Sequence, residues 1–228
     1  MAIKLWDLAG AEDDRRFSPY CWRVKMALMH KGLAFDTVPW RFHEKDALAF
    51  SGQALVPVIM DGGNEVHDSW TIATYLDQAY PDRSLLFGSD EARTLALLFR
   101  LWVERSVHPL LLKAVVMDLY DRLHDEDKAY FRETREKRFG MTLERYGADP
   151  QGTLASLRTA LDPARPVLGE RPFFSGRASG FADYALFGAF QWSRAISPLR
   201  LLESDDPLYA WRERMLDLFG GYARAAKS

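Results

Sequence analysis

Short apolar runs alternate with longer stretches of helical periodicity in the first third of the chain. Four of these runs have the length and composition of β-strands: Ile3–Leu8, Ala34–Val38, Pro57–Met60 and Glu65–His67. Helical patterns lie between and after them, at Pro19–Lys31, in a short stretch before Pro57, and at Trp70–Tyr80. The predicted order is therefore β-α-β-α-β-β-α, which is a small α/β unit.

Turn residues indicate the directions of the strands. The helix between the first two strands is followed by Gly32, which readily takes the left-handed conformation common after a helix end. Strands joined through a helix are expected to be parallel. Gly62-Gly63 separates the last two runs, so these strands are expected to form an antiparallel hairpin.

The rest of the chain shows helical patterns and no convincing strand. A turn-rich segment near Pro81–Ser84 separates the two regions, so we place a domain boundary between Asp82 and Asp90. Residues 1–82 then form the α/β domain and residues 90–228 form an all-α domain. Its expected helices are Glu91–His124, Glu126–Tyr146, Gly152–Leu161, Phe181–Arg194 and Pro207–Phe219.

Two features modify this helical prediction. Pro109 lacks the N–H that a helix interior needs, so the first long helix is expected to kink or divide there. The charged segment Asp125–Arg138 places Arg132 and Glu136 at helical spacing, and we interpret it as a solvated helix face without a binding role.

Composition and charge exclude several classes of protein. The 228 residues are 48% hydrophobic and 27% charged, as in globular proteins rather than disordered or fibrous ones. With 30 Lys and Arg against 32 Asp and Glu, the chain has no net positive field for a nucleic acid. The single cysteine, Cys21, and five scattered histidines form neither a disulfide framework nor a metal motif, which favours a reducing compartment. No secretory signal and no apolar stretch long enough for a membrane are visible, so a cytoplasmic protein is expected.

The tetrapeptide Ser18-Pro19-Tyr20-Cys21 places a hydroxyl at the start of the first helix. Pro19 suits the first helical position, which makes Ser18 the N-cap. In one interpretation the hydroxyl accepts a hydrogen bond from a backbone N–H of the first turn. In the other, the hydroxyl and the helix dipole together stabilise a bound anion, such as a thiolate. The tetrapeptide alone favours the cap.

Two further pairs of residues could contact a ligand. Pro57 should begin its strand, and a cis Val56–Pro57 bond would turn the backbone N–H and C=O of Val56 toward a ligand. The local sequence does not choose between the cis and trans isomers. Asp68 and Ser69 precede a helix that either residue could cap. Alternatively, Ser69 binds a carboxylate and Asp68 attracts an ammonium group, a pairing that suits an α-amino acid.

Taken in order along the chain, these three signals resemble the cytosolic glutathione transferases. The resemblance covers essentially the whole sequence, and its strongest parts are Phe17–Val24, Val56–Ile59 and Asp68-Ser69-Trp70. Ser-Pro-Tyr-x-Trp-Arg, Asp-Ser-Trp and the segment Gly180–Ala185 are most similar to the bacterial β-aryl etherase-like group and to related fungal transferases.

The resemblance implies a thioredoxin-like domain that binds glutathione and a helical domain that forms the wall of the electrophile pocket. Ser18 matches the catalytic hydroxyl of the serine-type classes. Val56 precedes Pro57, which matches the family's cis-proline, and its backbone would pair with the cysteinyl part of glutathione. Asp68 and Ser69 match a pair, more often Glu-Ser, that holds the γ-glutamyl end. A homodimer is also implied.

Three more polar residues are candidates for glutathione binding. Arg41 and His43 lie in the connection after the second strand, where the family commonly uses a basic residue to bind the glycyl carboxylate. Gln53 is a further polar candidate in the same region. None belongs to a fixed motif, and a solvated basic loop is the alternative interpretation.

The segment Gly180–Asp183 resembles the family's buried helix-capping motif. Ser or Thr usually stands where this chain has Gly180, which offers no side-chain acceptor. Asp183 is expected to reach back to the backbone near Gly180, so only half of the reciprocal capping box can form. This role is structural rather than catalytic.

Three functions remain open from the sequence. The first is transfer of glutathione to an apolar electrophile, aromatic ones included, or glutathione-dependent cleavage of an aryl ether. The second is a non-catalytic carrier of hydrophobic ligands with the same glutathione cradle. The third is a glutathione-linked thiol reductase that uses Cys21, because Ser18-x-x-Cys21 has the redox spacing. The alternative for Cys21 is a small buried residue that packs its helix on the sheet.

Overall fold

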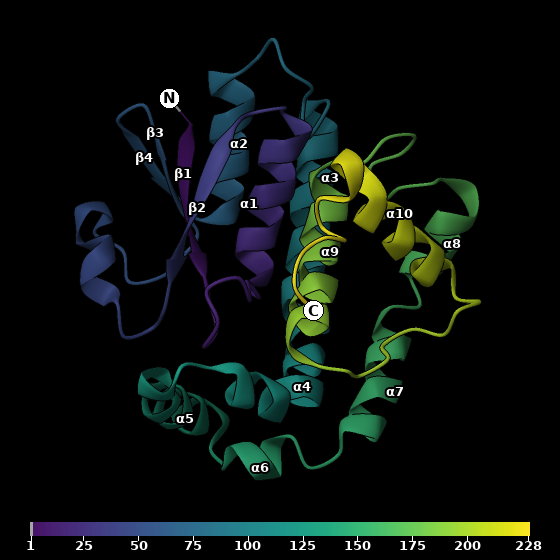
Figure 1. Ribbon diagram of the computed structural model, residues 1–228. Coiled ribbons are helices and arrows are strands. Elements are labelled where there is room, and N and C mark those ends of the chain that lie inside the picture. The colour runs from purple at the N-terminus through teal and green to yellow at the C-terminus, as the bar shows by residue number, and fades with distance from the viewer. Residues whose placement is uncertain (1) are drawn as a thin grey trace.

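The computed structural model describes residues 2–228 and places a four-stranded sheet in the N-terminal domain (Figure 1). Its strands, in the order β2-β1-β3-β4, are β1 (Ile3–Leu8), β2 (Phe35–Trp40), β3 (Val58–Asp61) and β4 (Asn64–His67). β1 and β2 are parallel, whereas β3 is antiparallel to both β1 and β4. The predicted strand directions are therefore confirmed, and this α/β domain is thioredoxin-like.

Helices pack against this sheet. α1 (Pro19–His30) and α2 (Ser69–Ala79) contact each other on the side that faces the helical domain. The 3-10 helix η1 (Lys45–Ser51) lies on the other side of the sheet (Figure 1). α1 ends where expected, because Gly32 has a φ of +62° and takes the left-handed conformation that no other residue adopts as easily.

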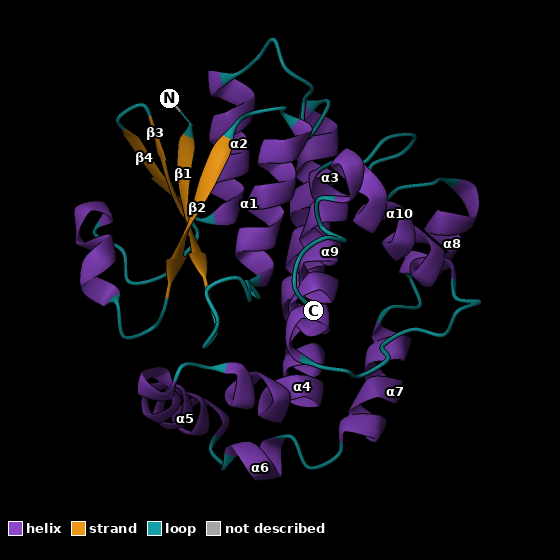
Figure 2. Cartoon of the chain, in the orientation of Figure 1, coloured by secondary structure: helices purple, strands orange, loops and turns teal. Residues whose placement is uncertain are grey.

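The second domain is helical and follows α2. Its elements are α3 (Asp90–Trp102), the π-helical turn η2 (Val103–Val107), α4 (His108–Arg122), α5 (Asp125–Phe139), α6 (Leu143–Tyr146), α7 (Pro150–Ala160), α8 (Ala164–Glu170), α9 (Phe181–Ile196) and α10 (Pro207–Gly221). Figure 2 shows that the named strands belong to the N-terminal part alone. Among residues 2–228, no helix is both long and apolar enough to cross a bilayer.

Local sequence explains where the helices depart from the predicted ones. The stretch Glu91–His124 divides at η2, which places Pro109 in the first turn of α4, where its missing N–H is not needed. The single helix expected over Glu126–Tyr146 instead ends at Gly140, whose φ of +67° is left-handed. α8 was not predicted, because it is short and contains Pro166, a residue that disfavours a helix interior.

α9 forms the centre of the helical domain. Nearly all of its residues are buried, and its main partner in the N-terminal domain is α1. The two helices approach closely at Gly188, where a Cβ atom would lie 2.3 Å from the carbonyl oxygen of Pro19. Because Pro19 begins α1, this contact positions the end of α1 at which Ser18 lies.

Asp183 anchors the first turn of α9. Its carboxylate accepts hydrogen bonds from the backbone N–H groups of Phe174, Ser175 and Gly180 at 2.8, 3.1 and 3.1 Å. A fourth bond comes from Nε1 of Trp211 at 2.9 Å. Gly180 has no side chain, so the structure forms only the half of the capping box that Asp183 supplies, as predicted.

Candidate active site

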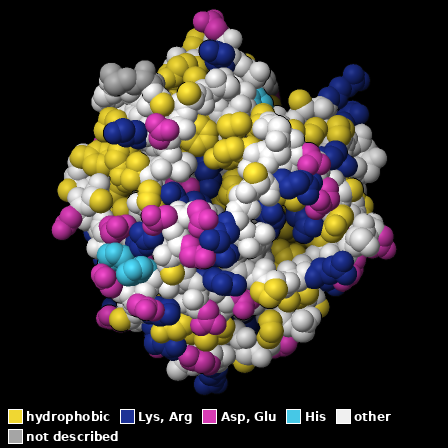
Figure 3. All heavy atoms as spheres, viewed as in Figure 1, with side chains coloured by type: hydrophobic (Ala, Val, Ile, Leu, Met, Phe, Trp, Pro, Cys, Tyr) yellow, Lys and Arg dark blue, Asp and Glu magenta, His cyan; other side chains and the backbone are white. Residues whose placement is uncertain are grey.

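A cavity of about 470 Å³ opens between the two domains. The N-terminal domain supplies the loop before α1, the segment before β3 and the start of α2, and the helical domain supplies η2, α4, α5 and α9. Figure 3 shows one face of the molecule, on which patches of apolar side chains lie among charged ones. The volume lies in the range of sites for small molecules.

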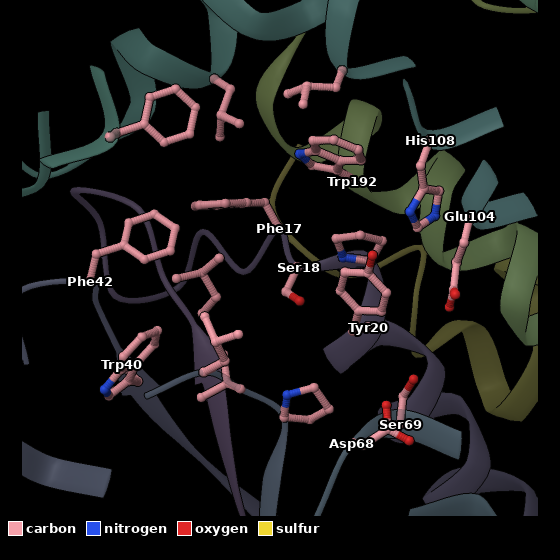
Figure 4. Close-up of a pocket in the computed structure, with 18 of the residues that line it drawn as sticks. Phe17, Ser18, Tyr20, Trp40, Phe42, Asp68, Ser69, Glu104, His108 and Trp192 are labelled. Atoms are coloured by element: carbon pink, nitrogen blue, oxygen red, sulfur yellow. The ribbon is translucent and has the colours of Figure 1, made fainter. Parts of the chain in front are cut away.

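Ser18 lies at the N-terminus of α1 and points into the middle of the group of side chains drawn in Figure 4. Its Oγ accepts a hydrogen bond from the backbone N–H of Cys21 at 3.2 Å, which confirms the predicted N-cap. The cap uses the hydroxyl oxygen as the acceptor, and the hydroxyl hydrogen can rotate toward a ligand in the cavity. Since a hydroxyl accepts and donates at once, Ser18 can cap the helix and still donate a hydrogen bond to a ligand.

Val56 and Pro57 line the cavity next to Ser18. The Val56–Pro57 peptide bond is cis, which the sequence left open. Across the described chain, the backbone N–H and C=O of Val56 take part in none of the backbone hydrogen bonds. Val56 therefore offers one free backbone donor and one free backbone acceptor, which could pair with the backbone of a bound peptide.

Asp68 and Ser69 lie together on the side of the cavity opposite Phe42 (Figure 4). Asp68 is the N-cap of α2, because its Oδ1 accepts from the N–H groups of Trp70 and Thr71 at 3.0 and 2.9 Å. The Oγ of Ser69 is buried and has no hydrogen-bond partner among the residues described. A buried hydroxyl without a partner is costly, so Ser69 is suited to a polar group of a ligand.

The remaining candidates divide between the cavity and the surface. Gln53 lines the cavity. Arg41 does not, because its guanidinium donates to the carbonyl of Gly10 at 2.9 Å and pairs with Asp13. His43 contacts Asp127 through Nδ1 at 2.8 Å, also outside the cavity wall. The structure thus does not bring Arg41 and His43 to the cavity.

The helical domain adds polar groups that the sequence analysis missed. Glu104 of η2 lines the cavity and is held by Arg23, whose Nη1 donates to Oε1 at 2.5 Å. His108 lies one turn further on, with its ring near those of Tyr20 and Trp192 (Figure 4). The spacing of four residues between Glu104 and His108 is the one sequence signal that places both on one helix face.

His108 is buried, and its Nε2 has no partner in the described chain. Burial, assisted by the positive charge of Arg23, lowers the pKa of His108 to about 3, so the imidazole is neutral at physiological pH. In the unfolded chain the same side chain takes up a proton near its ordinary pKa of about 6.5. Acidification below that value therefore favours the unfolded state.

Replacing His108 with phenylalanine should flatten the dependence of stability on pH. From about pH 7.5 to about pH 5, His108 alone should lower the free energy of unfolding of the native sequence by about 2 kcal/mol. The phenylalanine ring would keep the aromatic contacts and remove the titration. Urea unfolding at several pH values measures the difference. Equal pH slopes for the native protein and His108→Phe would contradict the buried, neutral imidazole.

α5 lines part of the cavity. The sequence analysis had interpreted this segment as a solvated helix face without a binding role, and that interpretation is incomplete. The expected pair of Arg132 with Glu136 forms at 2.8 Å. Three residues on another face of the helix, Phe131, Arg135 and Arg138, line the cavity. The sequence analysis missed this because alternating charges have the same pattern whether a helix faces solvent or a cavity.

Cys21 is completely buried in α1. Burial, with a smaller effect of the nearby Asp7 carboxylate, raises the pKa of the Cys21 thiol far above its ordinary value. A neutral, inaccessible thiol is a poor nucleophile. The geometry therefore agrees with Cys21 as a packing residue and gives no support to a thiol reductase.

One group of side chains outside the cavity could hold a metal ion. Ligand atoms of His43, His124 and Glu126 lie within 4.8 Å of one another, where the loop after β2 meets the start of α5. Asp127 holds Nδ1 of His43, as a carboxylate commonly does for a metal-binding histidine. The sequence had shown these histidines as scattered, because the fold brings together segments about eighty residues apart.

Comparisons with known proteins agree with the fold. Residues 14–84 match the family model described as glutathione S-transferase, N-terminal domain, and residues 94–206 match the one described as glutathione S-transferase, C-terminal domain. The probable glutathione S-transferase GSTU6 of Oryza sativa subsp. japonica is 27% identical over 214 residues, which cover 86% of this chain and 80% of the rice protein.

Solved structures are similar over nearly the whole chain. Glutathione transferase GSTFuA3 from Phanerochaete chrysosporium has a TM-score of 0.78 and 25% identity, and the match covers 98% of this chain and 94% of that one. The glutathione S-transferase CsGST63524 of Ceriporiopsis subvermispora, solved in complex with glutathione, has a TM-score of 0.79 and 23% identity, with 97% and 98% of the two chains covered.

Proposed function

Because the chain belongs to the glutathione S-transferase superfamily, we propose that it binds glutathione in this cavity and transfers the sulfur to an electrophile whose reacting part is an apolar, aromatic group. One observation carries the proposal: Ser18, Val56 and Ser69 all line one cavity and each has unused hydrogen-bonding capacity. A cytoplasmic homodimer is the form expected of such an enzyme.

The polar side of the cavity suits the two ends of a γ-glutamyl peptide. The free hydroxyl of Ser69 can donate to the α-carboxylate, and the carboxylates of Asp68 and Glu104 attract the ammonium group. The backbone of Val56 can pair with the peptide backbone of the cysteinyl residue. Gln53 is the nearby polar side chain available to the glycyl end.

Ser18 would then act on the sulfur as a hydrogen-bond donor. A free thiol has a pKa of about 8.5, and lowering it by about two units requires about 2.7 kcal/mol of preferential stabilisation of the thiolate. One hydrogen bond to a charged acceptor contributes about 1.5 to 3 kcal/mol, and the N-terminal end of α1 adds to it. Ser18 keeps its own proton throughout, and the thiol releases its proton to solvent water when the thiolate forms.

The electrophile would lie beside the sulfur, between the two domains. Trp192 of the helical domain and Phe17 and Phe42 of the N-terminal domain give this side of the cavity aromatic walls (Figure 4). When the thiolate attacks an electrophilic carbon, the new C–S bond replaces the bond to the leaving group, which departs with its electron pair. With an aryl ether as substrate, the leaving group would be a phenolate, which is the reaction of the β-etherase type.

Replacing Ser18 with alanine should lower turnover by about tenfold or more, equivalent to at least about 1.4 kcal/mol of transition-state stabilisation. The pKa of bound glutathione, followed by the ultraviolet absorbance of the thiolate, should rise in the variant. Turnover should be assayed with a general aryl halide and with an aryl ether, which separates the two kinds of transferase.

Ser89→Ala is the matched control. Ser89 caps α3 through Ala92 N–H at 3.2 Å, as Ser18 caps α1, but it lies outside the cavity. Both variants should lose about 1 kcal/mol of stability, and only Ser18→Ala should lose turnover. If the two variants had equal turnover, Ser18 would cap α1 and have no role in catalysis. Tight glutathione binding without turnover of any electrophile would instead indicate the carrier.

A further inference from the structure

We propose that the electrophile is an aromatic anion, whose ring packs against Phe42 and Phe131 and whose carboxylate binds the guanidinium of Arg135. This inference rests on the function proposed above, because it names the substrate class of the same cavity. It follows from the charges of α5 and from the rings beside them.

One face of α5 presents cations to the cavity. Phe131, Arg135 and Arg138 are spaced by four and three residues, so they lie along one side of the helix, and all three line the cavity. Arg132 is not part of the wall and is satisfied elsewhere, by Glu136 and Glu144 at 2.8 Å each. The arginine on the face away from the cavity is therefore already paired with carboxylates of the protein.

The cations that face the cavity lack an anion. In the part of the chain that the structure describes, no carboxylate lies within 4.0 Å of Arg135 or Arg138. Arg135 donates only to Oγ1 of Thr134, at 3.0 Å. Burial and the neighbouring charge of Arg138 lower the pKa of Arg135, whereas Tyr130 raises it. A ligand anion would offset both unfavourable effects.

The rings beside Arg135 indicate that the anion is aromatic. The guanidinium carbon lies 4.8 Å from the ring centroid of Phe131 and 5.6 Å from that of Phe42. An aromatic ring that packs against either side chain brings a carboxylate on its edge within reach of the guanidinium. The planar guanidinium can then bind both carboxylate oxygens. A neutral hydrocarbon would leave the charge unpaired, and an aliphatic acid would not use the rings.

The transfer step leaves the carboxylate unchanged. The sulfur lone pair of the glutathione thiolate forms a C–S bond with the ring carbon that bears the leaving group. The bond to the leaving group breaks, and a halide or phenolate departs with the electron pair. Thiolate and aryl halide thus give a thioether and a halide ion, and the carboxylate serves only for recognition.

Two matched substrates test the proposal by turnover. A chlorodinitrobenzoate with its carboxylate para to the chlorine is compared with the corresponding carboxamide, which has the same shape and no charge. For each variant, kcat/KM for the acid is divided by kcat/KM for the amide. The two substrates differ in intrinsic reactivity by the same factor in every variant, so a change in this ratio reports a change in recognition of the carboxylate. Arg135→Gln should lower this ratio about tenfold, or by about 1.4 kcal/mol, and Arg135→Lys should retain part of it. Arg132→Gln should leave it unchanged.

Binding without turnover gives an independent readout. The dissociation constants of naphthoate and naphthamide, measured by calorimetry, should show the same dependence on Arg135. Circular dichroism melts of Arg135→Gln and Arg135→Lys establish that both variants fold. The dissociation constant of glutathione is measured in parallel for each variant.

The outcomes separate this inference from the proposed function. Conjugation of both substrates with an unchanged ratio in Arg135→Gln overturns anion recognition and leaves the transferase intact. A second result would also overturn anion recognition: Arg135→Gln binds glutathione more weakly, and its ratio of kcat/KM for acid and amide is unchanged. Arg135 would then hold a carboxylate of glutathione. A third result would separate the two proposals: naphthoate binds in a way that depends on Arg135, but neither substrate is conjugated to glutathione. This result would support anion recognition and contradict the proposed transferase activity.

Discussion

Replacing Asp183 with alanine should lower the free energy of unfolding by about 4 kcal/mol. Asp183 is completely buried and accepts four hydrogen bonds. Its removal leaves three backbone N–H groups and the indole N–H of Trp211 inside the protein without an acceptor. Urea unfolding followed by tryptophan fluorescence measures the loss.

Asp149→Ala is the control for this prediction. Asp149 caps α7 by accepting from the N–H of Gly152 at 2.8 Å, in an exposed position where water can replace it. Its loss should cost about 1 kcal/mol, the usual value for an N-cap. If Asp183→Ala lost no more stability than Asp149→Ala, the buried carboxylate would not be an anchor of the fold.

Replacing Gly188 with alanine should lower the free energy of unfolding by about 3 kcal/mol and should also reduce turnover. A Cβ atom at this position would lie 2.3 Å from the carbonyl oxygen of Pro19, far inside van der Waals contact. One of the two helices, α1 or α9, must therefore move. Because Ser18 precedes Pro19 directly, movement of α1 displaces the hydroxyl that we propose acts on the sulfur. Stability and kcat/KM are measured on the same preparation.

The control is Gly169→Ala in α8, where a Cβ atom would have no neighbour within 4 Å. There the change should be neutral or should stabilise the protein by up to about 1 kcal/mol, since alanine favours a helix over glycine. Turnover should not change. A Gly188→Ala variant as stable as Gly169→Ala would show that α1 and α9 can separate without cost.

The sequence predicted most of the N-terminal domain, because its signals are local. Apolar runs of strand length gave the four strands, and Gly62-Gly63 gave the antiparallel hairpin that pairs β3 with β4. Helix ends were predicted where proline restricts the backbone or where glycine permits a left-handed turn, as at Gly32. The helical domain was predicted less well where a turn interrupts a continuous pattern, as at Gly140, or where a proline lies in a short helix, as in α8.

The residues of the candidate site were also predicted best where the signal is a local motif. The residues that carry motifs, Ser18, Val56, Pro57, Asp68 and Ser69, all line one cavity in the structure. Whether they bind glutathione stays a prediction for the experiments above. Of the three candidates without a motif, Gln53 lines the cavity. Arg41 and His43 are engaged elsewhere, by Asp13 and Asp127, because a basic loop residue pairs with whichever carboxylate the fold brings near it.

The sequence by itself determined which segments are strands and helices, where most of them begin and end, and which hydroxyl caps α1. These features depend on interactions among residues a few positions apart, which a linear pattern records. Only the tertiary structure decided that Arg135 and His108 reach the same cavity as Ser18. That placement depends on how α9 packs against α1, α4 against α9 and α5 against α4. The contacts that join the two domains connect residues about a hundred positions apart, and no local pattern records them.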